Sequence, residues 1–192
     1  MKKYQKLLIV LNLYRLILGY FIFKHNKFKD KLKMDLDAWK RRQNINNSNF
    51  ISFCYFIMIT PEFRNVVLNR LHRNPIKYLL FKMMFKPMES LYINVSPEKI
   101  GGGLYFQHGF ATIVCCKEIG VNCSINQQVT IGFNGNESAT IKDNVTICAG
   151  AIVIGNVTLN NNCVIGAGSV VTKDVEENAV VAGVPARIIK YK

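Results

Sequence analysis

The sequence predicts an α+β protein in which an N-terminal helical region, residues 1–92, precedes a parallel β-helix, residues 93–192. Three observations lead to this fold class. Aliphatic residues recur every six positions through the second half. Apolar runs at helical spacing, interspersed with lysines, fill the first half. The formal net charge of +13 also arises entirely in that first half.

The charge divides the chain into two parts with different surfaces. Residues 1–92 contain 18 Lys and Arg against 5 Asp and Glu, whereas residues 93–192 contain seven of each kind. Such an excess suits a polyanion, either nucleic acid or an anionic membrane, or else a solvated helical face. No glycine-rich or aromatic RNA-binding motif accompanies the charge, so nucleic acid is not expected. The hydrophobic content of 49% is enough for a packed core and argues against disorder.

The first element, residues 7–23, reads LLIVLNLYRLILGYFIF. It is shorter than the roughly 20 residues of a membrane-spanning helix, and no small-residue cleavage site follows, so a signal peptide is not predicted. Gln5, Asn12, Arg15 and Gly19 fall on one helical stripe, and the other positions are apolar. The helix therefore either lies on the inner leaflet of a membrane or packs against another subunit. The lysine-rich KHNKFKDKLK that follows favours the membrane.

Further helices complete the first half. MDLDAWKRRQN is amphipathic, and NFISFCYFIMITPEFRNVVLNRLHR contains Pro61, which suits the first turn of a new helix. NPIKYLLFKMMFKP places Lys77, Lys82 and Lys86 around an apolar face.

A six-residue repeat defines the second half. Its members are Ile119, Ile125 and Ile131, then Ile141, Ile147, Val153, Leu159, Ile165 and Val171. The residue four positions after most of them is small or β-branched, and Asn and Gly occur between. This period is typical of a parallel β-helix, in which three short strands and three turns make one coil. The aliphatic residue points inward, and Asn or Gly supplies left-handed backbone at the turns.

The repeat has two irregular places. An earlier register runs through Ile100, Phe106 and Thr112 and is expected to slip by one residue to Ile113, which puts His108 near a coil corner. Between Ile131 and Ile141 the spacing is ten residues, which predicts a loop excursion within FNGNESAT. Loops that leave a solenoid often carry function.

Six cysteines are present without a Cys-x-x-Cys pair: Cys54, Cys115, Cys116, Cys123, Cys148 and Cys163. We expect reduced, buried thiols in a cytoplasmic protein, because several of them occupy small positions of the repeat.

Residues 93–190 resemble the hexapeptide-repeat acyltransferases, specifically the serine acetyltransferase-like branch in its polysaccharide-cluster form. The resemblance rests on IGGGLYFQHGFATIV, INQQVTIG, TIKDNVTICAGAIVIGNVTLNNNCVIGAGSVVTKDV and VVAGVPARI, and the helical ITPEFRNVVLNRL extends it. It implies a left-handed β-helix, a homotrimer, and acetyl-CoA as co-substrate between adjacent prisms. No permanently bound cofactor and no metal are expected.

The resemblance also implies roles for individual residues. His108 matches the general base that takes the proton of the acceptor hydroxyl, a role suited to a neutral imidazole. Gly132, Ala149 and Ala167 match small positions along the pantetheine arm, and Lys173 and Arg187 match basic positions near the nucleotide phosphates.

Three departures concern the acceptor. The carboxylate that orients the base in serine acetyltransferases aligns with Ile93 or Asn94, the acid before the histidine is Gln107, and the second histidine aligns with Ser138. We therefore expect a sugar hydroxyl as acceptor, on a lipid-linked glycan at the inner leaflet, within surface polysaccharide biosynthesis. The enzyme would be cytoplasmic with peripheral membrane contact.

Serine O-acetylation is the alternative function. A zinc-dependent carbonic anhydrase on the same prism needs three histidines per metal, and only His108 lies in the repeat, since His25 and His72 lie in the helical half. A non-catalytic scaffold is the third class, against which the intact QHG motif argues.

Overall fold

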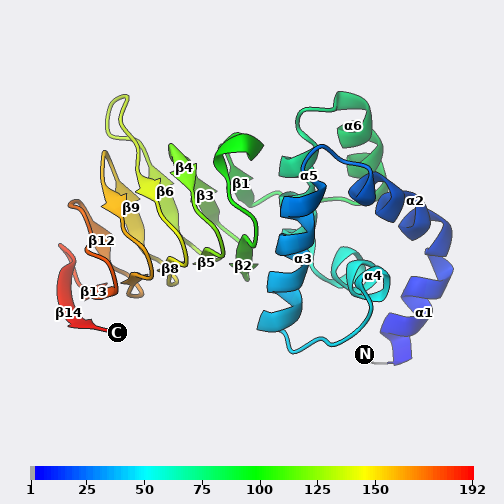
Figure 1. The fold of residues 1–192 in the computed structure, drawn as a ribbon, viewed down its shortest axis with the longest axis horizontal. Helices are drawn as coiled ribbons and strands as arrows, with labels where there is room; N and C mark the ends of the chain where they lie inside the picture. Colours follow the sequence, from blue (N-terminus) through cyan, green and yellow to red (C-terminus); the bar gives the residue numbers. More distant parts are fainter. Residues whose placement is uncertain (1–2) are drawn as a thin grey trace.

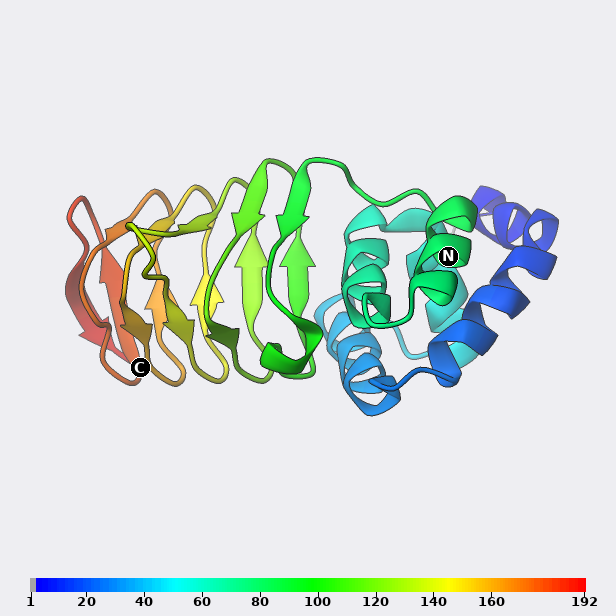
Figure 2. The same ribbon diagram turned by 90° about the horizontal axis from the view of Figure 1, so that it is seen from above.

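The computed structural model describes residues 3–192, in which six α-helices pack against one end of a three-sided prism of short strands (Figures 1 and 2). The helices are α1 (Lys3–Leu11), α2 (Leu13–Lys24), α3 (Lys29–Arg42), α4 (Asn49–Ile59), α5 (Pro61–Leu71) and α6 (Pro75–Met84). The first strand begins at Leu91, so the change from helix to prism falls close to the predicted boundary.

Three sheets form the sides of the prism. Sheet A has the order β1 (Leu91–Ile93), β3 (Thr112–Val114), β6 (Thr130–Gly132), β9 (Ile152–Ile154) and β12 (Val170–Val171). Sheet B has the order β10 (Thr158–Leu159), β7 (Thr140–Ile141) and β4 (Glu118–Ile119). Sheet C has the order β14 (Arg187–Tyr191), β13 (Ala179–Ala182), β11 (Val164–Ile165), β8 (Thr146–Ile147), β5 (Ser124–Asn126) and β2 (Tyr105–Gln107). The strands pair in parallel, except that β14 runs antiparallel to β13. A short 3₁₀ helix, Pro97–Lys99, precedes β2.

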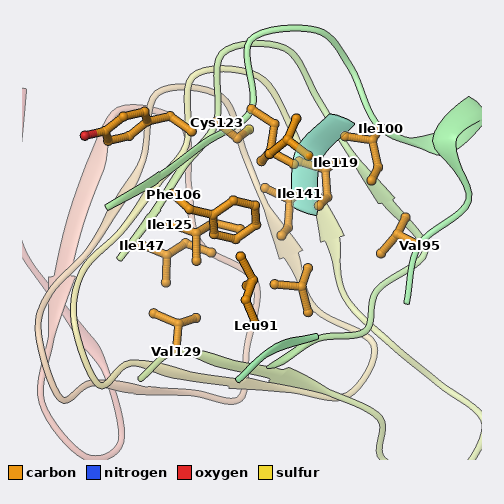
Figure 3. Close-up of a cluster of buried hydrophobic side chains, with 14 of the residues drawn as sticks. Leu91, Val95, Ile100, Phe106, Ile119, Cys123, Ile125, Val129, Ile141 and Ile147 are labelled. Atoms are coloured by element: carbon orange, nitrogen blue, oxygen red, sulfur yellow. The ribbon is translucent and has the colours of Figure 1, made fainter. Parts of the chain in front are cut away.

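The predicted left-handed β-helix is confirmed. Each repeat aliphatic named above is at most 2% exposed, and those of successive coils stack along the prism axis (Figure 3). In sheet C, for example, Phe106 pairs with Ile125, and Ile125 with Ile147. Several turns use left-handed asparagine, at Asn122, Asn144, Asn162 and Asn178, with φ between 56° and 61°. The six-residue period is therefore the spacing of one strand and one such turn.

The expected slip from Thr112 to Ile113 is wrong. Ile113 is 45% exposed, whereas Thr112 and Val114 are buried. Gln107 pairs with Asn126 in the next coil, but the following pair is Ile113 with Thr130, so the chain between them is two residues longer in the first coil. The irregularity is thus an enlarged corner, residues 108–112, which we call the His108 corner. The predicted excursion after Ile131 is present, with Asn134 bonded to Glu137 across a turn at Gly135.

The apolar run of residues 7–23 was expected to be one helix, but it is divided into α1 and α2, which are bent by 78°. The side-chain amide of Asn12 donates to the carbonyl oxygen of Leu8 at 2.9 Å, and Arg15 donates to the Asn12 amide oxygen at 3.0 Å. Such local side-chain bonds compete with the regular helix ladder. Among residues 3–192 no single helix has the length and apolarity to cross a membrane, although this bent pair and the pair α4 and α5 meet those criteria jointly.

Pro61 starts a new helix, as predicted. It is the first residue of α5, at an angle of 109° to α4. Pro75 likewise opens α6, where the side-chain oxygen of Asn74 accepts from the backbone N–H of Lys77. Proline suits the first helical turn because its missing N–H has no partner there.

A buried ion pair joins the helical half to the prism. Arg70 of α5 and Asp35 of α3 are 1% and 0% exposed, and the Arg70 Nε lies 3.0 Å from the Asp35 Oδ2. Arg70 also donates to the carbonyl oxygens of Pro97, Ile100 and Gly101. Asp35 accepts from the backbone amides of Gly103 and Leu104, which directly precede β2. Both charges are therefore satisfied by backbone groups of the first coil.

Two further side chains strengthen this junction. The indole N–H of Trp39 donates to the carbonyl oxygen of Leu104 at 2.9 Å, and Lys31 donates to the carbonyl oxygens of Pro97, Glu98 and Ile100. Burial raises the pKa of Asp35, and Arg70 with the two amides opposes that rise.

Replacing Arg70 with Met leaves Asp35 buried without its counter-ion, so we expect the free energy of unfolding to fall by about 3–5 kcal/mol. Chemical denaturation followed by circular dichroism measures this change. Arg73→Met is the control, because Arg73 pairs with Glu98 on the surface, and its unfolding midpoint should not move. A loss below about 1 kcal/mol for Arg70→Met would contradict the assigned role.

Candidate active site

Sheets C and A meet along one edge of the prism, and His108 lies on that edge, at the corner of the first coil. It follows β2, is exposed, and has a φ of +55°, the left-handed region that few residues other than Gly and Asn adopt readily. Its carbonyl oxygen accepts from the backbone N–H of Phe110 at 2.6 Å. The enlarged corner therefore presents the imidazole outside the prism instead of packing it inside.

Two of the predicted CoA residues lie along the same edge. The corners of successive coils are joined by backbone bonds: Gln128 donates to Phe110, Gly150 to Gln127, and Gly168 to Ala149. Ala149 is half-buried, and Ala167 is exposed one coil further on. At about 4.8 Å per strand, three coils separate the His108 corner from Ala167 by roughly 14 Å. A Cβ added at Gly168 would meet nothing within 4 Å, so the corner that follows Ala167 is open.

The other predicted CoA residues are divided between two places. Arg187 pairs with Ala182, whose Cβ lies 3.2 Å from the position of a Cβ added to Gly166, so Arg187 is close to the Ala167 corner. Gly132 ends β6 and the exposed Lys173 follows β12, so both lie at the far end of the sheet A strands. The structure thus groups Ala149, Ala167 and Arg187 with His108 but places Gly132 and Lys173 on the opposite edge.

The structure shows where the positions that depart from the serine acetyltransferase pattern lie. Asn94 follows β1 at that opposite edge, where its backbone N–H donates to Val114 and its side chain bonds the thiol of Cys115. Ser138 is buried in the loop that follows Gly132. Ile93 packs against the core, and Gln107 is exposed at the end of β2. The positions that align with the orienting carboxylate and the second histidine therefore lie on a different edge from His108 of the same chain.

The sequence analysis missed one charged residue beside His108. Glu62, in the first turn of α5, is 7% exposed. Its Cγ lies 3.2 Å from the position of a Cβ added to Gly109, the residue after the histidine. An acid just after a helix-opening proline looks like an ordinary N-terminal helix charge. Only the packing of α5 on the first coil identifies it as a neighbour of the corner.

The cysteines are all free, and five of the six are buried, with Cys148 intermediate. Burial raises the pKa of the Cys116 and Cys123 thiols to about 12 and that of Cys54 and Cys163 to about 11. A thiol in this state is not a nucleophile at neutral pH. His25 and His72 lie at the ends of α2 and α5.

Comparison with known proteins first defines the class. Residues 138–173 match the bacterial transferase hexapeptide family (six repeats). A serine acetyltransferase of Staphylococcus xylosus is 30% identical over 172 residues, which cover 85% of this chain and 79% of that protein. A serine acetyltransferase of Brucella abortus strain S19, solved in complex with coenzyme A, superposes with a TM-score of 0.60 at 28% identity, covering 89% of this chain and 71% of that one. Fold, repeats and relatives together define a hexapeptide-repeat acyltransferase.

Within that class, the chain belongs to the serine acetyltransferase-like branch. Its match to a serine acetyltransferase of Synechococcus elongatus is 40% identical over 96 residues, 47% of this chain. That alignment spans only 39% of the Synechococcus protein.

These comparisons overturn the expectation of a sugar acceptor and of a role in polysaccharide biosynthesis. The relatives and the solved structure are serine acetyltransferases, which agrees with the alternative function, serine O-acetylation. The expectation was wrong because it judged the acceptor pocket only from aligned prism positions. Asn94 and Ser138 lie on the other edge, whereas Glu62, whose Cγ lies beside Gly109 of the His108 corner, comes from a helix.

Thiol alkylation tests the state of the cysteines. Iodoacetamide at pH 7.5 is expected to modify Cys148 first and to leave Cys116 and Cys123 unmodified in the folded protein, because burial keeps those thiols protonated. Peptide mass spectrometry measures the modification at each position, and a denatured sample provides the control. Early alkylation of Cys116 or Cys123 would contradict the described packing.

Proposed function

We propose that the protein is a serine O-acetyltransferase, which transfers the acetyl group of acetyl-CoA to the side-chain hydroxyl of serine. The Staphylococcus xylosus relative carries this proposal, because its alignment includes the helical half as well as the prism. The exposed imidazole of His108 supplies a suitable base. The six free thiols suit a reducing compartment, so we assign the enzyme to the cytoplasm.

His108 acts as the general base. Its neutral imidazole takes the proton of the serine hydroxyl while that oxygen attacks the thioester carbonyl carbon. The tetrahedral intermediate then collapses with cleavage of the carbon–sulfur bond, and the imidazolium returns its proton to the leaving sulfur. The products are O-acetylserine and the free thiol of CoA. Backbone amides at the corners are the available donors to the oxyanion.

The arrangement of the site favours a homotrimer. Ala149, Ala167 and Arg187 lie near the edge of His108, and Gly132 and Lys173 lie at the opposite edge of sheet A. Within one prism the strands of sheet A separate the two groups. When three prisms pack side by side, the first edge of one copy faces the second edge of its neighbour. The small residues then border the pantetheine arm, and the two basic residues approach the phosphates.

The helical half carries a surface suited to an anionic lipid bilayer. Large apolar residues are exposed at positions i, i+3, i+4 and i+7 of three helices: Tyr4, Leu7, Leu8 and Leu11 in α1, Tyr14, Ile17, Leu18 and Phe21 in α2, and Ile76, Leu79, Leu80 and Met83 in α6. These helices are neighbours, with α1 and α2 at the end of the molecule away from the prism (Figure 1). We call these twelve residues the apolar face.

The stripe of polar residues in α1 and α2 points the other way. Gln5 and Gly19 are buried, Phe85 covers Gly19, and the Arg15 guanidinium lies 5.3 Å from the centre of the Phe85 ring. An outward apolar face with flanking lysines is the arrangement of a helix that lies on lipid. A second copy is a poor partner for this face, since two halves with 18 basic and 5 acidic residues each would repel.

Acetyl-CoA turnover, followed as free thiol, tests the activity. We expect the unaltered protein to acetylate serine and the His108→Asn variant to lose about 10²–10⁴-fold in kcat, because the base is removed. Asparagine is the chosen replacement because it tolerates the left-handed backbone at this position. Glu89→Gln, at an exposed acid paired with Lys86, is the control, and its kcat should not change. Full activity in His108→Asn would contradict the assigned mechanism.

Vesicle flotation tests the apolar face. The unaltered protein should float with vesicles that contain phosphatidylglycerol, and the double variant Tyr14→Ser, Ile17→Ser should bind them at least about tenfold more weakly, since two large apolar side chains are lost. The control is Ile188→Ser, Ile189→Ser, which alters exposed residues of β14. Equal flotation of both variants would contradict the proposal, as would a fall in oligomer mass caused only by the α2 substitutions.

A further inference from the structure

Glu62 differs from the other buried acid of the helical half. Asp35 accepts hydrogen bonds from Arg70 and from two backbone amides, whereas the Glu62 carboxylate has no hydrogen bond or ion pair with any residue in the range 3–192. The side chain is mostly buried, yet its oxygens are not among the fully buried side-chain atoms without a partner in the described residues, so the carboxylate reaches the surface. The carboxylate is therefore accessible to a molecule that binds there during function.

The neighbouring charges compensate Glu62 only in part. Its place in the first turn of α5 gives some stabilisation from the helix dipole. Arg64 is close enough for Glu62 to raise its pKa, although burial lowers that pKa overall. The guanidinium of Arg64, however, donates to the carbonyl oxygens of Ile57, Met58 and Lys86. Three of its five N–H donors are therefore committed to the backbone, none of these bonds involves Glu62, and the carboxylate can attract another cation.

The position of Glu62 determines which cation can reach it. The Glu62 Cγ lies 3.2 Å from the point where a Cβ on Gly109 would stand, and Gly109 follows His108 directly. The acceptor hydroxyl must lie at the imidazole of His108 for its proton to be removed. A group attached to the second carbon atom from that hydroxyl is therefore held near the same corner. In serine, that group is the ammonium.

We propose that the Glu62 carboxylate binds the ammonium group of the acceptor amino acid and thereby selects serine over hydroxyl compounds that lack an amine. The inference rests on the proposed function and names the residue that recognises its substrate. Burial strengthens the interaction, because a charge-assisted hydrogen bond is stronger where water is scarce. The prism then supplies the base, and helix α5 supplies the acceptor specificity.

Steady-state kinetics with two acceptors test the assignment. L-Serine is compared with 3-hydroxypropionate, which has the same hydroxyl and carboxylate but no amine. In Glu62→Gln we expect the KM for serine to rise about 10- to 100-fold, with the KM for acetyl-CoA unchanged. The preference in kcat/KM for serine over 3-hydroxypropionate should fall by a similar factor. Glu89→Gln is the matched control, because Glu89 is an exposed acid paired with Lys86 near the start of β1.

Thermal unfolding provides a second measurement, whose result would differ if Glu62 had only a structural role. Because Glu62 is unpaired in the free protein, Glu62→Gln should keep or raise the Tm while it weakens serine binding. A fall in Tm together with an equal loss for both acceptors would overturn the proposal. An equal loss in kcat for both acceptors with a shifted pH profile would also overturn it, because the carboxylate would then orient His108.

The failure of this inference is distinguishable from failure of the proposed function. If the unaltered protein does not turn over serine, the proposed function falls, and this inference falls with it. If the unaltered protein acetylates serine and Glu62→Gln retains its serine KM and its preference for serine, only the assignment of Glu62 is overturned.

Discussion

The buried pair of Asp35 and Arg70 is the interaction on which the rest of the molecule depends. A β-helix leaves unpaired backbone groups at the start of its first coil, and such groups must find partners when they are buried. Here Arg70 bonds the carbonyl oxygens of Pro97, Ile100 and Gly101, and Asp35 bonds the amides of Gly103 and Leu104. The helices therefore complete the hydrogen bonding of the prism, and the prism in turn satisfies two charges of the helices.

This junction also fixes the geometry of the candidate site. Arg70 and Glu62 both belong to α5, eight residues apart, or about 12 Å along the helix axis. Because Arg70 is anchored to the backbone between Pro97 and Gly101, the first turn of α5 has little freedom to leave the His108 corner. The base and the acidic side chain come from different halves of the chain, and a single rigid helix holds them in register.

The fold was predictable because every coil requires the same kinds of residue at the same positions. A strand residue that points inward must be aliphatic, so nine positions report one structure, and the asparagines between them mark the turns. The first coil has a neighbouring coil on one side only, so its enlarged corner had no repeat against which to be aligned, and Ile113 was misplaced. Asp35, Arg70 and Glu62 each look ordinary within an amphipathic helix. Their roles depend on contacts between residues 27 to 69 positions apart, which no local pattern records. The same limit explains the incorrect sugar acceptor, because the prism sequence was read without the helix that covers it.

The reversed strand β14 has a consequence for how copies of the protein can meet. Parallel coils stack without a natural limit, so an uncovered final coil is a template for the first coil of another molecule and hence for fibre growth. On sheet C that template is replaced by a strand of opposite direction, exposed at all five residues and bearing Arg187 and Lys190. Two molecules that approached end to end along this strand would bring like charges together. Fibre growth along the prism axis is therefore disfavoured, whereas closed oligomers with the prisms side by side can still form.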